Sequence, residues 1–243
     1  MKRATVVLLI AVLGCLVTGC LTAGKELLLY EREPIALVSV TSNWDINWKG
    51  EEPTNPRLVA STTRRTLRSD PDLTLISNAE ELINTAEILF RDTMAESGGL
   101  ISLAEKEKVL LSRAYQEARL SKYQINREDV TPAGYRLVDF RDKSFPPAFA
   151  AETGIQRCMF LEFKFTKIIR SGFGKNGNAG ADVEMKVLIL DARGKTLYTK
   201  TFSMGSRDTI SVSSGVYSQS GLLGLFDSVI NDAAYEFLYH LED

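Results

Sequence analysis

Few residues of this chain belong to the types that usually carry catalysis or bind metals. The 243 residues include three cysteines and one histidine, His240. Zinc is usually held by cysteine and histidine, and a serine or cysteine nucleophile usually has a histidine as its base. No serine is followed three residues later by lysine and no G-x-S-x-G motif occurs, so the patterns of penicillin-recognising enzymes and α/β-hydrolases are absent. We therefore expect no catalytic residue, no metal site and no cofactor.

Three short motifs suggest ligand binding but are better explained as loops and turns. Residues 172–177 match G-x-G-x-x-G, yet the dinucleotide fingerprint needs a helix to follow, and another alternating strand follows here. We expect a flexible hairpin loop at this point. Residues 194–196 resemble the end of a P-loop, but Ile189 stands where its first glycine belongs. Residues 45–50 begin like a calcium loop, but Lys49 occupies a ligand position.

Two groups of residues are candidates for binding a partner. Trp44 and Trp48 are four residues apart, a spacing that puts both rings on one side of a helix or a strand. We expect either an exposed aromatic platform for a protein or glycan, or a lid over the core. Arg64, Arg65 and Arg68 lie in the same irregular stretch. They indicate either a solvated, internally paired face or contact with anionic headgroups or an acidic partner.

The composition is that of an average globular domain. Hydrophobic residues make up 44% of the chain and charged residues 25%, with a net charge of -2 and a pI near 5.7. Binding to a phosphate backbone demands a basic surface. We therefore expect no nucleic-acid partner.

The N-terminus is typical of an export signal. Two basic residues precede an apolar run over residues 4–17, which is too short to cross a bilayer as a helix of roughly 20 apolar residues. Residues 17–20 read VTGC and resemble the lipobox of bacterial lipoproteins, in which the cysteine takes a diacylglycerol before cleavage. The resemblance implies a signal peptide over residues 1–19 and an acylated Cys20 that holds the protein on the bilayer without spanning it.

The residues after Cys20 set the position of the domain. Leu21 stands where the inner-membrane retention signal of enteric bacteria has Asp, so we expect the cell outer membrane, with the protein facing the periplasm. Residues 20–34 form the acylated cysteine and a tether that extends to roughly 50 Å at most, which keeps a single domain over residues 35–243 close to its membrane. Cys158 has no disulfide partner within the mature chain, and we expect a buried, inert thiol.

Strands and helices alternate in the first half of the domain. An apolar run predicts a buried strand over residues 35–40, and residues 43–73 read as an irregular segment. Capping boxes at Ser77 and Ser102 predict two helices, the second running to about Arg119.

The second half predicts an antiparallel meander. Apolar and polar residues alternate over residues 161–165 and 183–187, and a third strand is expected over residues 196–204. Residues 206–221 are dense in serine and glycine and predict a mobile loop. Apolar residues at helical spacing from residue 222 to 241 predict a terminal amphipathic helix.

The order of these elements resembles the periplasmic domain of the CsgG/LpoB-like lipoproteins and is similar to the TolB N-terminal domain. The resemblance lies in the apolar first strand, the short strand and Ala-Glu-Lys helix at residues 100–114, the helix and long strand at residues 148–165, and the hairpin at residues 191–195. It implies an α/β fold, a mixed sheet with an antiparallel C-terminal meander packed by amphipathic helices.

The same resemblance implies a function without catalysis. We expect an assembly or accessory factor that works through protein-protein contacts at the cell envelope. The alternative is an envelope lipoprotein that binds glycan or lipid through its aromatic loop.

Overall fold

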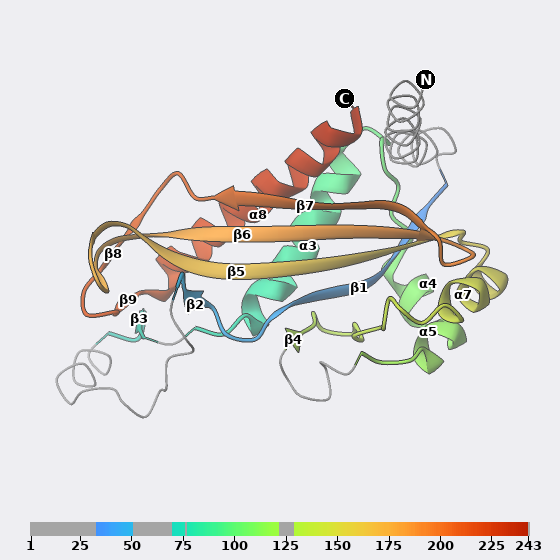
Figure 1. Ribbon diagram of the computed structural model, residues 1–243, viewed down its shortest axis with the longest axis horizontal. Helices are drawn as coiled ribbons and strands as arrows, with labels where there is room; N and C mark the ends of the chain where they lie inside the picture. Colours follow the sequence, from blue (N-terminus) through green and yellow to red (C-terminus); the bar gives the residue numbers. More distant parts are fainter. Residues whose placement is uncertain (1–32, 51–69, 76, 122–128, 243) are drawn as a thin grey trace, which may run out of the picture.

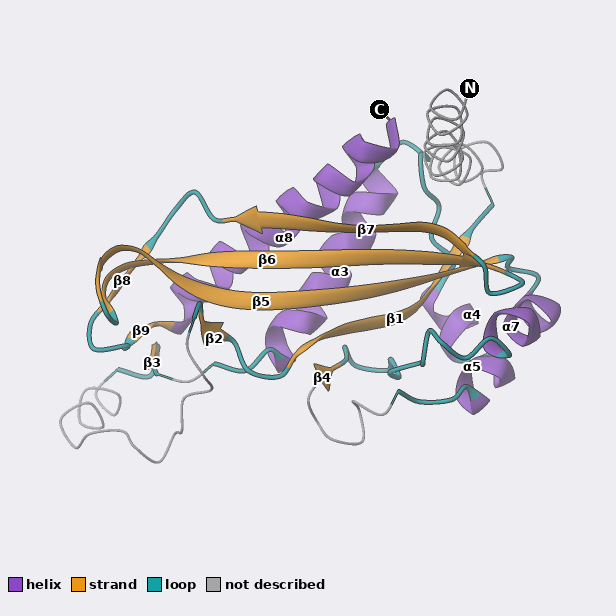
Figure 2. Cartoon of the chain, viewed as in Figure 1, coloured by secondary structure: helices purple, strands orange, loops and turns teal. Residues whose placement is uncertain are grey.

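The computed structural model describes residues 33–50, 70–75, 77–121 and 129–242 (Figure 1). In this part of the chain a seven-stranded mixed sheet runs through the molecule, with helices on both of its faces (Figure 2). The α/β class and the mixed sheet expected from the sequence are confirmed.

A long antiparallel hairpin forms the middle of the sheet. β5 (Arg157–Phe173) pairs with β6 (Asn176–Asp191), and β6 pairs in turn with β7 (Thr196–Gly205). Alternating side chains predicted these strands, because Leu161 and Phe163 are buried on one face while the residue between them is exposed. The antiparallel meander is therefore confirmed.

β1 (Ile35–Asn43) lies along the other edge of β5, parallel to it. Its side chains are buried from its first residue to Ser42, which explains the unbroken apolar run in the sequence. β4 (Asp129–Val130) pairs with the end of β1, and β2 (Asn47–Trp48) continues beside β5. The strand order is β4-β1-β5-β6-β7.

Two long helices cover one face of the sheet (Figure 2). They are α3 (Glu80–Glu96) and α8 (Gln219–Glu242). Their apolar sides form the larger core with the sheet, in which the rings of Phe90 and Phe237 stack at 6.1 Å. α3 ends before Gly98, whose φ of +66° suits glycine, as the sequence predicted.

Three short helices pack on the opposite face, near the start of β5. They are α4 (Lys106–Leu110), α5 (Arg113–Glu117) and α7 (Phe145–Thr153), and they enclose a smaller core. The single helix expected over α4 and α5 is wrong. The chain turns at Ser112, whose hydroxyl accepts a hydrogen bond from the amide of Tyr115 at 3.3 Å and so begins a new helix.

The stretch from residue 206 to 221 is not the single mobile loop that its composition suggested. β8 (Ile210–Val212) pairs with β6, and β9 (Tyr217–Ser218) pairs with β3 (Leu73–Thr74). β8 forms because β6 extends beyond β7 and offers it a partner. The expected flexible loop of the β5–β6 hairpin is also wrong, since both strands stay paired up to a tight turn.

Candidate functional site

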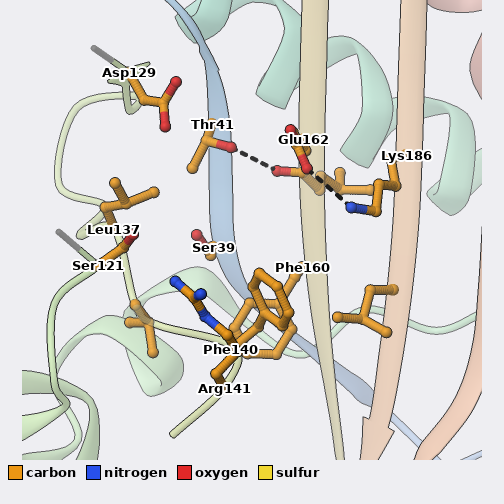
Figure 3. A pocket seen from close by; sticks show the side chains of 13 residues that line it. Ser39, Thr41, Ser121, Asp129, Leu137, Phe140, Arg141, Phe160, Glu162 and Lys186 are labelled. Atoms are coloured by element: carbon orange, nitrogen blue, oxygen red, sulfur yellow. Dashed lines mark hydrogen bonds and ion pairs between the residues drawn. The ribbon is translucent and has the colours of Figure 1, made fainter. Parts of the chain in front are cut away.

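A pocket of about 310 Å³ opens on the face of the sheet opposite α3 and α8. Its floor is formed by β1, β5 and β6. Residues 137–141 form one wall, in which Phe140 lies beside Phe160 of β5 (Figure 3). The pocket combines three kinds of side chain. Apolar groups come from Leu137, Phe140 and Phe160, hydroxyl groups from Ser39, Thr41 and Ser121, and charged groups from Asp129, Arg141, Glu162 and Lys186.

Phe140 stands at the mouth of this pocket with 47% of its surface exposed. Its ring lies edge-on to Phe160, with centroids 6.4 Å apart. The guanidinium of Arg141 lies 5.6 Å and the ammonium of Lys186 lies 5.9 Å from the centroid of the Phe140 ring. Two cationic groups therefore lie within 6 Å of the exposed Phe140 ring, close enough for cation–π contact.

A turn at Asp139 gives Phe140 this position. The Asp139 carboxylate accepts hydrogen bonds from the amide of Arg141 at 3.1 Å and from its Nε at 3.2 Å. This is the local bond with which aspartate favours turns. Residues 137–141 lie in none of the described strands or helices, and the turn directs the Phe140 ring outward.

The charges at the rim are balanced within the chain. Lys186 lies 3.3 Å from Glu162, its partner across the β5–β6 pair, and Asp139 holds Arg141. Thr41 donates to the carbonyl of Leu161 at 3.4 Å. The described lining contains neither cysteine nor histidine. It suits an amphipathic group whose apolar part contacts the phenylalanines and whose polar part reaches the rim.

The two tryptophans differ in exposure, so the expectation of an exposed platform made by both rings is wrong. Trp48 is only 6% exposed and lies edge-on to Tyr217, with ring centroids 6.0 Å apart, whereas Trp44 is 40% exposed. The spacing argument assumed one regular element across both residues, but β2 begins only at Asn47 and Ile46 is already buried. Trp48 is a lid over the core, and Trp44 alone remains exposed.

Lys167 is a buried residue near this lid that the sequence analysis missed. It is 3% exposed, and its ammonium donates to the hydroxyls of Ser77 at 3.1 Å and Tyr217 at 3.0 Å. It also lies 5.2 Å from the Trp48 ring centroid. The alternation of β5 could have predicted this burial, because Lys167 follows Phe163 and Phe165 at the spacing of two residues that marks the buried face of the strand. Ser77 is engaged here and does not cap α3, and the amide of Glu80 donates instead to Asn78.

A second hollow of about 340 Å³ lies beside Trp48. Its lining combines the aromatic residues Trp48 and Phe165 with polar and charged side chains, among them Asn47, Lys164 and Glu184. Aromatic and amide or carboxylate groups side by side are suited to a neutral polar ligand.

Cys20, Arg64, Arg65 and Arg68 lie outside the described residues, as do the signal peptide and most of the tether. Cys158 is buried as expected, and burial raises the pKa of its thiol to about 12. No group of three or more His, Cys, Asp or Glu side chains in the described ranges is placed to hold a metal ion. None of the helices described has the length and apolar character needed to cross a membrane.

No protein-family model matches the chain, and no curated protein matches it. Among solved structures the chain is similar to the LpoB C-terminal domain from Salmonella enterica, with a TM-score of 0.27 and 10% identity over 75% of this chain and 93% of that one. It is also similar to lipoprotein GNA1162 from Neisseria meningitidis, with a TM-score of 0.28 and 16% identity over 83% and 99% of the two chains. For the hypothetical protein CT253 from Chlamydia trachomatis the TM-score is 0.34 and the identity 8%, over 86% and 98%. The likeness to LpoB expected from the sequence is thus found, at low identity, and TM-scores of this size support no inference about function.

Proposed function

We propose that this chain is a bacterial lipoprotein anchored to the outer membrane through an acylated Cys20. It acts as a non-enzymatic assembly or accessory factor by contacting another envelope protein. The VTGC sequence at residues 17–20 supports the anchor, since two acyl chains hold a protein stably on a bilayer.

The observation that carries the binding role is the exposed ring of Phe140 at the mouth of the pocket. Large aromatic side chains near the centre of a contact surface are typical anchors of protein interfaces. Two ion pairs lie beside this ring, Glu162 with Lys186 and Asp139 with Arg141. An apolar centre with a polar rim is the usual composition of an interface between proteins that also exist apart.

Site-specific photocrosslinking in cells tests this proposal. A photoreactive residue at position 140 should give an adduct with an envelope protein, whereas one at Asp92, exposed on α3 and on the opposite face, should not. Phe140→Ala should weaken capture about thirtyfold, which corresponds to about 2 kcal/mol. Equal adducts from both positions, or none from position 140, would refute the role of the pocket.

The hollow beside Trp48 favours a second candidate function, glycan binding. Its amide and carboxylate groups, those of Asn47 and Glu184 beside the aromatic Trp48, suit sugar hydroxyl groups. Titration calorimetry with soluble peptidoglycan fragments tests it. Saturable binding that is lost in Glu184→Ala and kept in Phe140→Ala would support the glycan function, and no binding would exclude these fragments as ligands.

A further inference from the structure

β7 is an edge strand with few of the features that normally prevent pairing. In the described part of the chain the sheet order ends at β7, whose ten residues pair with β6. Its sequence contains no proline, and Lys200 is its single charged side chain. Edge strands of native proteins are usually kept short or protected by charges, proline or bulges.

One hydrogen bond shows which backbone amides and carbonyls of β7 point away from β6. The amide of Ser206 donates to the carbonyl of Ala181 at 2.8 Å, directly after the ladder in which Gly205 lies opposite Asp182. Hydrogen-bonded pairs alternate along an antiparallel ladder. From Tyr198 to Met204, where the ladder is regular, even-numbered residues of β7 therefore bond to β6. The amides and carbonyls of Thr199, Thr201 and Ser203 point away from the sheet.

We propose that β7 pairs with β7 of a second copy of this chain, antiparallel and centred on Thr201. A twofold axis at Thr201 places Thr201 opposite itself and Thr199 opposite Ser203 of the second copy. Each outward amide then meets an outward carbonyl. The opposed side chains are hydroxyl pairs, which favour cross-strand pairing, and all three are exposed on the open face of the sheet.

The position of Lys200 selects this register over its neighbours. Centring the pair on Lys200 would place two ammonium groups directly opposite each other, which is destabilising. Centring it on Phe202 would shorten the overlap of the two strands. With Thr201 at the centre, Lys200 lies opposite Phe202 of the second copy, and its ammonium already lies 5.2 Å from the centroid of the Phe202 ring in its own chain. The interface is isologous and closes as a dimer.

This register has a geometric consequence that a cysteine can report. Residues in a hydrogen-bonded antiparallel pair have Cα atoms about 5.5 Å apart, within the range of roughly 4.4 to 6.8 Å that a disulfide requires. The two copies of Ser203 are four residues out of register, so their Cα atoms lie about 13 Å apart along the strands and about 14 Å apart in all. Thr201→Cys should therefore crosslink to itself, and Ser203→Cys should not.

The test uses the full chain in its native membranes, with mild oxidation and non-reducing electrophoresis. Thr201→Cys should give a homodimer band, while Ser203→Cys and the wild-type chain, with its own cysteines, remain at background. Crosslinking of Thr201→Cys no stronger than that of Ser203→Cys would overturn the proposal. So would crosslinking of Thr201→Cys to a different protein without any homodimer.

A charge variant provides an independent measurement. Thr201→Lys places two ammonium groups opposite each other, and the detergent-solubilised chain should sediment as a monomer where the wild-type chain sediments as a dimer. The side chain of Thr201 is exposed and its amide is not used by β6, so the melting temperature should stay within a few degrees. A Thr201→Lys chain that still dimerises, or a wild-type chain that is monomeric at about 100 μM, would overturn the proposal. Neither result bears on the pocket at Phe140.

Discussion

The carboxylate of Glu87 in α3 lies 2.9 Å from the ammonium of Lys106, the first residue of α4. Glu87 is 3% exposed, and its other partners are Arg91, one turn along α3, and the hydroxyl of Tyr135, which donates at 3.0 Å. A buried carboxylate has a large desolvation cost, which these charged and hydrogen-bonding partners offset. The cluster joins α3 to α4 and to the segment that leads to Phe140.

The Glu87 cluster predicts a loss of stability in acid. Burial alone raises the pKa of Glu87, but hydrogen bonds and charges from Lys106 and Arg91 outweigh it and hold the pKa below its ordinary value of 4.5. A carboxylate with a lower pKa in the folded chain stabilises fully above its unfolded pKa and loses this contribution as the pH falls through the folded value. Glu87→Gln should therefore cost about 2 to 3 kcal/mol at pH 7 and clearly less at pH 3.

Urea unfolding at both pH values measures this difference. Glu107→Gln is the control, because Glu107 is exposed on the same short helix as Lys106. The control should unfold like the wild-type chain at both pH values. A Glu87→Gln chain that loses as much stability as the wild-type chain between pH 7 and pH 3 would contradict the assignment.

The sequence predicted those parts of the fold that are determined by residues close together along the chain. β5, β6 and β7 follow from alternation and short turns, and α8 follows from helical spacing. The burial of Cys158 followed from its place at the start of an apolar strand. These patterns depend only on residues that are close together in the sequence, so they can be recognised without knowing the fold.

The failures involve residues whose environment comes from distant parts of the chain. β8 forms because β6 is long enough to pair with it, and Ser77 leaves its expected cap because Lys167 lies within reach of its hydroxyl. The pocket brings Ser39, Phe140 and Lys186 together from three distant segments. No local pattern at Phe140 indicates that its ring is exposed, since the turn at Asp139 determines this.

The two tryptophans should differ in their effect on stability. Trp48 is buried against Tyr217 and Lys167, so Trp48→Ala should cost about 3 to 5 kcal/mol. Trp44 is 40% exposed, and Trp44→Ala should cost less than about 1 kcal/mol. Urea unfolding of the two single variants decides the matter, and equal losses would show that Trp44 also belongs to the core.

The proposed lipid anchor predicts a specific change at Cys20. Metabolic labelling with palmitate should be abolished by Cys20→Ala, and the protein should leave the membrane fraction, because the acyl chains are then missing. Cys158→Ala is the matched control and should keep its label, since Cys158 is buried in the domain. Undiminished labelling of the Cys20→Ala chain would end the lipoprotein interpretation.

The tip of the β5–β6 hairpin should respond to substitution at Gly172 far more than at its neighbours. A Cβ atom at Gly172 would overlap the carbonyl oxygen of Asn176 and lie 2.8 Å from the Cα of Gly177, and the φ of Gly172 is +124°. Gly172→Ala therefore requires the two strands to separate. Gly174 has a φ of +61° with nothing within 4 Å of such a Cβ atom, so Gly174→Ala should cost only the left-handed backbone penalty of about 1 to 2 kcal/mol.

Phe173, between these two glycines, supplies the control for the tip. Its ring is 91% exposed, so Phe173→Ala should change the free energy of unfolding by no more than about 0.5 kcal/mol. The expected order of destabilisation is Gly172→Ala, then Gly174→Ala, then Phe173→Ala, measured by urea unfolding of the three variants. A flexible loop would tolerate all three changes alike. That result would contradict the paired tip, because only strands in contact make the space at Gly172 too small for a methyl group.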